Sequence, residues 1–299
     1  MATTAVSRAW LAYAALLIVG AAIYVACQLF PADLPFWMPW EFSWPVFLVT
    51  ALSLAWFGRG LKIQKLPRWR IACFAFGVAL DYAVLQTHVD YYAQHMFFVH
   101  RAAHFVLHHL GAFLIALGAA GPSIRAGMPD FARHALDAKP VRALCDVMQH
   151  PAVAPVLFVG LLYFWLIPAI HTRVMLDANL YDLMNWTMAI NGIFFWALIL
   201  DPRPKPPARI SSMMRAALIM VIELPQMVLG AILSLSMTDY YPVYGICGRI
   251  FAMTALNDQH YGGLIIWLPG TLTSLAAMIA VLVVLRINEE KEEHAHQTV

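Results

Sequence analysis

Histidine is concentrated in one stretch of this sequence. Six of the twelve histidines occur between residues 88 and 109, namely His88, His95, His100, His104, His108 and His109. Imidazole binds copper, zinc and iron, and its ordinary pKa lets it carry protons near neutral pH. The stretch therefore predicts either a metal site or a proton-handling cluster.

The spacing inside this stretch favours a metal site. His100, His104 and His108 are four residues apart, which places them along one face of a helix. Two imidazoles at positions i and i+4 can bind one metal ion, although the full H-E-x-x-H motif of zinc proteases is absent. His109 lies about 100° further round the helix, so for it we expect only a hydrogen bond between helices. A hydrogen bond between helices is also the alternative role for each of the other histidines.

Side chains from other segments complete the predicted site. Asp81 lies within another apolar segment, and Asp258 precedes the last one. The sequence also has fifteen methionines, whose thioether sulfur selects Cu(I). We therefore predict copper as the bound metal. The predicted ligands are Asp81, His100, His104, His108, Asp258 and His260.

Arg101 argues against a simple metal site. It lies three residues before His104 on the same predicted helix. A fixed cation there would repel a metal ion unless a carboxylate, from Asp81, Asp90 or Asp258, neutralises it. Alternatively, Arg101 and an acid form the polar core and the histidines serve that pair.

The composition shows what must surround these residues. The chain of 299 residues is 62% hydrophobic and 12% charged, against about 25% charged residues in an average soluble domain. Lipid must therefore be the solvent for much of its surface. There is no basic stripe with aromatic residues, so we expect no nucleic-acid partner. There is no phosphate-binding loop or G-x-S-x-G motif, so we lean against an enzyme.

The apolar segments predict an all-α membrane bundle. A helix needs about 20 apolar residues to cross a bilayer. Eight segments qualify, with seven possible because the second is short. They are 9–30, 40–58, 69–88, 92–120, 151–170, 183–200, 211–236 and 262–286.

Lysine and arginine are concentrated in alternate loops, at 59–70, 121–150 and 201–210. By the positive-inside rule, we expect these loops and both termini to be cytoplasmic. The histidine stretch would then lie toward the periplasmic side. We expect one transmembrane domain over 1–299, with a polar cytoplasmic tail at 287–299, in a bacterial inner membrane.

Several segments resemble those of a known family. The run Ala79-Leu80-Asp81 is followed by His100-Arg101-Ala102-Ala103-His104, and later by Gln149-His150-Pro151 and Trp165-Leu166-Ile167-Pro168. The segment from Asp258 to Gly270 is similar to the signature D-Q-x-x-G-G-x-x-x-W-x-P-G. Together they resemble the multi-span CtaG-like (caa-type) cytochrome c oxidase assembly family over roughly 40–286.

The resemblance implies a role in maturing a haem–copper oxidase by forming or delivering its copper centre. It also implies an oxidase subunit or a periplasmic copper chaperone as partner. Carried over by position, the functional residues are Asp81, His100, His104, Asp258 and Gln259.

The sequence also departs from the family pattern. Leu166 stands where the W-H-x-P segment has its histidine, and Met184-Asn185 stand where relatives often have Glu-His. Arg101 replaces an apolar residue.

Two other functions remain open from the sequence. His95 and His109 are 14 residues apart, a spacing that suits axial ligands of two haems, although no second span offers a matching pair. Alternatively, Asp81, the histidines and Glu223 line a path for copper or protons in a transporter with proline-broken helices.

Overall fold

The computed structural model describes residues 2–246 and 248–297. These residues form helices, turns and loops, and no β-strand occurs among them. The all-α prediction is therefore confirmed for the described part of the chain.

Four helices are long and apolar enough to cross a membrane, judged by length and composition. They are α1 (Ala2–Leu29), α3 (Arg68–Gln86), α13 (Ser212–Leu235) and α14 (Ala255–Gln297). Two bent pairs qualify when each is counted as one span. The run Phe97–Leu117 meets α7 (Gly121–Gly127) at 73°, and α9 (Lys139–Met148) meets α10 (Val153–Leu166) at 77°. The described residues thus hold four to six candidate spans, as expected of a membrane protein.

Two predicted spans correspond to helices outside this set. The segment 40–58 forms α2 (Trp44–Gly60), which has 17 residues. The segment 183–200 lies in α12 (Ala178–Ile199), which carries Asn185 and Asn191. The number of eight spans stays a prediction.

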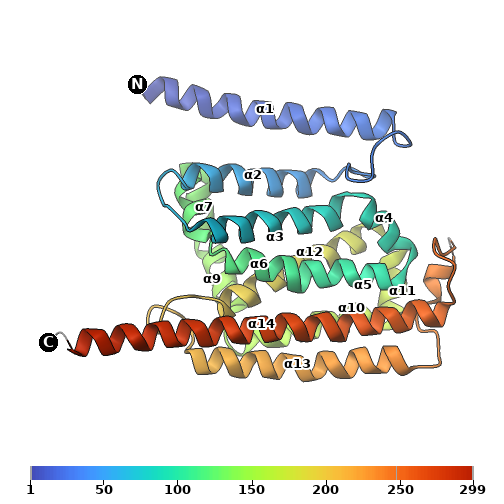
Figure 1. Cartoon of the computed structure of the whole chain (residues 1–299). Helices are drawn as coiled ribbons and strands as arrows, with labels where there is room; N and C mark the ends of the chain where they lie inside the picture. Colours follow the sequence, from blue (N-terminus) through green and yellow to red (C-terminus); the bar gives the residue numbers. More distant parts are fainter. Residues whose placement is uncertain (1, 247, 298–299) are drawn as a thin grey trace.

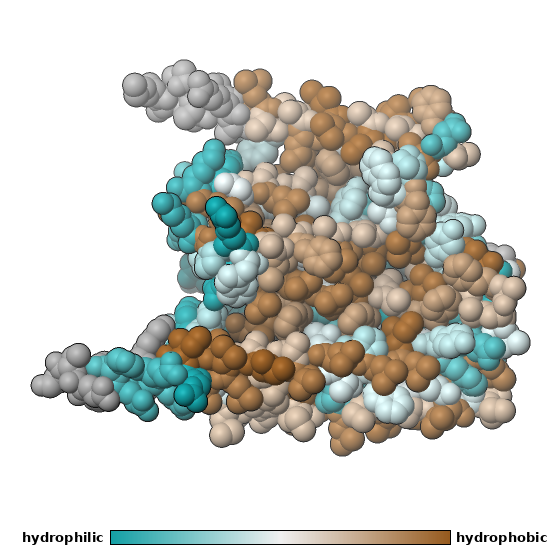
Figure 2. Space-filling view, viewed as in Figure 1, coloured by the Kyte–Doolittle hydropathy of each residue, from teal (hydrophilic) through white to brown (hydrophobic). Residues whose placement is uncertain are grey.

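The long helices run side by side (Figure 1). α1 lies at one edge of the bundle against α2, and α13 and α14 pack together at the opposite edge. The start of α1 and the end of α14 lie on the same side of the bundle. Figure 2 shows hydrophobic side chains across the middle of this face and hydrophilic ones toward its ends. A bilayer would cover such a band.

The shorter elements interrupt or connect the long helices. They are α4 (His88–His95), α5 (Phe97–Phe105), the π-helical turn η1 (Val106–Leu110), α6 (Gly111–Leu117), α8 (Asp130–Leu136), α11 (Pro168–Met175) and the 3-10 turn η2 (Pro242–Gly245). The segment predicted as one span over 92–120 is therefore α4, α5, η1 and α6 in succession. It breaks at Met96, which has extended backbone angles.

Glycine lets the helices approach closely around the histidine stretch. A Cβ on Gly262 would lie 2.3 Å from the ring of Phe97, and one on Gly230 would lie 2.7 Å from the Cβ of Trp267. Larger residues would force these helices apart, as is usual where membrane helices touch. Gly262 thus brings α14 against α5, and Gly230 and Gly263 bring α13 against α14.

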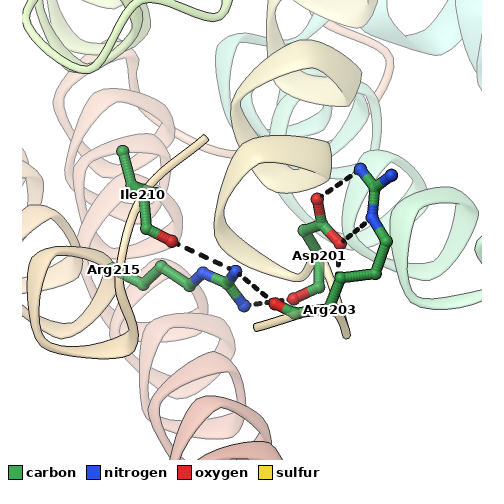
Figure 3. A network of polar contacts seen from close by, with 4 residues as sticks. All are labelled: Asp201, Arg203, Ile210 and Arg215. Atoms are coloured by element: carbon green, nitrogen blue, oxygen red, sulfur yellow. Dashed lines mark hydrogen bonds and ion pairs between the residues drawn. The ribbon is translucent and has the colours of Figure 1, made fainter. Parts of the chain in front are cut away.

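At the predicted cytoplasmic end, a polar network joins the loop after α12 to the start of α13 (Figure 3). The Arg215 guanidinium donates to the carbonyl oxygens of Asp201, Arg203 (3.0 Å) and Ile210 (3.3 Å). The Arg203 side chain in turn donates to the Asp201 carboxylate at 2.7 Å. This network fixes the proline-rich loop 201–210, the connector between α12 and α13, to the bundle.

The polar segment predicted as a tail continues the last helix. α14 extends to Gln297, well beyond the apolar candidate span that ends at Glu290. Residues 298–299 of the predicted tail lie outside the described residues.

Candidate functional site

The start of α5 is fixed by Asp258 of α14. The backbone N–H groups of Phe97 and Phe98 donate to its two carboxylate oxygens at 3.0 and 2.9 Å. Arg249 forms an ion pair with the same carboxylate at 3.1 Å. Asp258 is fully buried, so these contacts satisfy a charge that would otherwise be very costly. The structure thus engages this predicted ligand in capping α5.

α5 brings His100 and His104 into direct contact. Their Nε2 atoms are 3.0 Å apart, and Nε2 of His104 also lies 3.0 Å from Oδ1 of Asn185 on α12. Both imidazoles are buried. Two facing ring nitrogens at this distance share one proton, so one ring donates and the other accepts. The i, i+4 spacing therefore places these two side chains as the sequence predicts.

A tyrosine extends this pair toward α11. The hydroxyl of Tyr244 lies 2.7 Å from Nδ1 of His100 and 3.0 Å from Nε2 of His171. Nδ1 of His171 lies 3.0 Å from the carbonyl oxygen of Trp165. The result is a buried hydrogen-bonded chain, from His171 through Tyr244 and His100 to His104, which we call the imidazole chain.

Asp90 lies near His100 of the imidazole chain and is linked to it through Tyr181. Its carboxylate accepts hydrogen bonds from the Tyr181 hydroxyl at 2.8 Å and from the Gln94 amide at 2.9 Å. The Tyr181 ring is 5.6 Å from that of His100. Asp90 precedes the candidate span that begins at Phe97. Burial raises the pKa of Asp90 to about 6, because desolvation outweighs the hydrogen bonds that lower it.

The π-helical turn η1 directs both His108 and His109 into the bundle. A π turn holds one extra residue and releases a backbone carbonyl. The carbonyl oxygen of His108 accepts a hydrogen bond from the indole of Trp196 at 3.1 Å. The His108 ring stacks on Phe158 with centroids 3.8 Å apart. The helical spacing of the sequence predicts His108 inward but not His109, because the extra residue is not visible in the pattern.

A small cavity lies beside these two histidines. A water molecule's centre can occupy about 20 Å³ of it, which is room for about one water molecule. Neither ring nitrogen of His108, nor Nδ1 of His109, has a hydrogen-bond partner among the described residues. The lining residues are Arg101, His104, Phe105, His108, His109, Leu162, Met188, Gln226, Ile265 and Ile266.

Arg101 is the most unusual side chain of the site. It is 2% exposed, and none of its three nitrogens has a hydrogen-bond partner in the described chain. Its guanidinium lies 5.3 Å from the ring centroid of Phe97. Of the three carboxylates expected to neutralise it, Asp258 pairs with Arg249, Asp90 accepts from Tyr181, and Asp81 lies against Gly111. The polar core therefore carries a positive charge that no described carboxylate contacts.

Two other predicted ligands lie away from the imidazole chain. Asp81 on α3 packs into the gap at Gly111, where a Cβ would be 2.1 Å from its Oδ1. It lines a separate, mostly apolar cavity of about 250 Å³. His260 lies 2.7 Å from the carbonyl oxygen of Ser236.

Only part of the predicted ligand set is therefore brought together. His100, His104 and His108 lie along one helical segment, whereas Asp81, Asp258 and His260 contact other groups. Within the described residues, no group of three or more His, Cys, Asp or Glu side chains is placed to hold a metal ion. Sequence reasoning missed the parts played by Tyr244 and His171, which come from the 3-10 turn η2 and the short helix α11 and have no spacing signal.

One comparison with known proteins finds a family for this chain. A family described as cytochrome c oxidase caa3 assembly factor matches residues 46–286. No curated protein matches the chain, and no solved structure matches it. The family match covers the imidazole chain, the cavity and Arg101, and it leaves α1 outside.

Proposed function

This chain belongs to the cytochrome c oxidase caa3 assembly factor family, and we propose that it carries copper for a haem–copper oxidase. In this proposal, one cuprous ion is held as cargo between His100 and His104, in the outer half of a bacterial inner membrane. An oxidase subunit receives the ion, and a periplasmic copper chaperone is the proposed source.

The observation that carries the proposal is the convergence of two buried ring nitrogens. The Nε2 atoms of His100 and His104 are 3.0 Å apart. Metal–imidazole bonds are about 2 Å long, so two nitrogens bound on opposite sides of one ion lie about 4 Å from each other. Small side-chain rotations thus suffice to admit an ion between them. Copper(I) accepts such a low coordination number, and imidazole is among its ligands.

Two further features favour a soft monovalent ion. Met188 is fully buried and lines the cavity beside His104, and thioether sulfur prefers Cu(I). Arg101 places a cation next to the site, so an ion of charge +1 meets less repulsion than one of charge +2. Asn185, where relatives often have a histidine, lies 3.0 Å from Nε2 of His104 and offers an oxygen instead.

Copper content tests this proposal. The detergent-purified full-length chain is loaded with Cu(I) under reducing conditions, desalted, and assayed for metal and for its absorption spectrum. We expect about one copper per chain, with the double variant His100→Ala/His104→Ala retaining almost none. A matched control, His134→Ala/His150→Ala, removes two imidazoles at the other end of the molecule and should bind like the wild type. Equal copper in both double variants would refute the site, and a haem spectrum would favour the haem-binding alternative.

Proton transfer is the second candidate function. The imidazole chain connects His171, Tyr244, His100 and His104 by contacts of 2.7 to 3.0 Å, and such chains conduct protons in membrane proteins. Proton flux in liposomes that hold the purified protein tests this alternative. Flux that Tyr244→Phe abolishes would favour it over copper carriage.

A further inference from the structure

Arg101 carries a buried charge without a partner. Its side chain is 2% exposed, and all three guanidinium nitrogens lack hydrogen-bond partners among the described residues. Arginine stays protonated at any physiological pH. A lone cation inside a membrane bundle is strongly unfavourable, and such residues normally pair with an opposite charge.

Arg101 and His108 line this cavity, and each has nitrogens able to donate a hydrogen bond that are unpartnered within the described chain. Each neutral imidazole has one N–H group, and neither ring nitrogen of His108 has a hydrogen-bond partner among the described residues. Gln226 also lines the space, but its Nε2 donates to the carbonyl oxygen of Ile222 at 3.1 Å, so this side chain offers only its oxygen, an acceptor. No aspartate or glutamate is among the lining residues. The cavity is therefore electropositive.

The size of the cavity limits the ligand. A water molecule's centre can occupy about 20 Å³, so the space admits about one atom or ion of water size. A water molecule would satisfy the imidazoles but would leave the guanidinium charge uncompensated. A carboxylate or a phosphate is larger than the space.

We propose that the cavity formed by Arg101, His108 and His109 binds one small monovalent anion of halide size. Arg101 supplies the opposite charge, His108 donates an N–H group to the ion, and the ring of His109 lines the space. Apolar side chains such as Leu162 and Ile266 form much of the remaining wall. This anion site does not depend on copper and is measured without it.

Equilibrium dialysis with radiolabelled chloride tests the proposal on the metal-free, detergent-purified full chain, with gluconate as the replacing anion. We expect saturable binding of about one chloride per chain, weakened at least about tenfold in Arg101→Gln. The control Arg173→Gln removes an exposed cation from α11 and should bind as the wild type does. Binding that is unsaturable in the wild type, or unchanged in Arg101→Gln, would overturn the site.

A second variant and a competitor keep the test decisive if Arg101→Gln does not fold. His108→Leu leaves the guanidinium in place and removes one donor, so we expect chloride binding several-fold weaker. Bromide should compete for the labelled chloride. Acetate that competes as well as bromide, or full binding in His108→Leu, would contradict a halide-sized cavity lined by this histidine.

Discussion

Two buried arginines mark two regions of this molecule that treat a positive charge in opposite ways. Arg101 on α5 and Arg215 on α13 are each 2% exposed. The terminal nitrogens of Arg215 donate to the carbonyl oxygens of Asp201, Arg203 and Ile210 (Figure 3). The nitrogens of Arg101 have no such partners among the described residues.

This difference indicates that Arg215 has a structural role, whereas Arg101 has a role in binding a ligand. Arg215 joins a proline-rich connector to a helix, and Asp201 lies in the same network, so the charge is compensated where it stands. Arg101 lies among imidazoles and beside a cavity. Buried polar groups in folded proteins are almost always satisfied. An unsatisfied one inside a membrane bundle therefore indicates a ligand.

Replacing each arginine by methionine should give the largest difference between the two regions, in the free energy of unfolding. Arg215→Met leaves three carbonyl groups unpaired, so we expect a loss of about 3 kcal/mol or more in the free energy of unfolding. Arg101→Met removes an uncompensated charge and should be neutral or stabilising in halide-free buffer. Thermal unfolding in detergent measures both. Equal destabilisation by the two substitutions would show that Arg101 is as well compensated as Arg215.

The anion and the copper ion should support one another. This prediction rests on both proposals, because an anion at Arg101 reduces the repulsion that the guanidinium exerts on Cu(I) at His100 and His104. We expect chloride to tighten copper binding by up to about tenfold relative to gluconate, and copper to tighten chloride binding by the same factor. Competition with a Cu(I) chelator at constant ionic strength measures the first effect. A chloride effect that persists in Arg101→Gln would contradict the coupling.

The buried charge of Asp90 is compensated only in part, so it is intermediate between the charges of Arg101 and Arg215. Its folded pKa of about 6 lies above the ordinary 3.8, so the fold favours the protonated carboxyl. The stabilisation is complete below about pH 3.8 and is lost as the pH rises through about 6. Asp90→Asn mimics the protonated group. We therefore expect wild type to lose a few degrees more in unfolding temperature than this variant between pH 5 and pH 7.5.

Parallel unfolding curves for wild type and Asp90→Asn would show that this carboxyl does not titrate in that range.

The sequence predicts the helical class and the core pair well, because both rest on local rules. Long apolar segments must be helical in lipid, and His100 and His104 meet because i, i+4 neighbours share a face. His109 could not be placed, since the π turn that rotates it depends on Trp196 capturing a backbone carbonyl from another helix. The sequence shows that Asp258 has a carboxylate, which suits a metal ligand. Only the tertiary contacts show that this carboxylate caps α5.

The most direct test of the central claim is a copper K-edge absorption spectrum of the Cu(I)-loaded protein. If His100 and His104 hold the ion, the spectrum will show low-coordinate Cu(I) with two imidazole nitrogens at about 2 Å. That signal will be absent from His100→Ala/His104→Ala. A first shell without imidazole, or the same spectrum in the double variant, would contradict copper carriage at this pair.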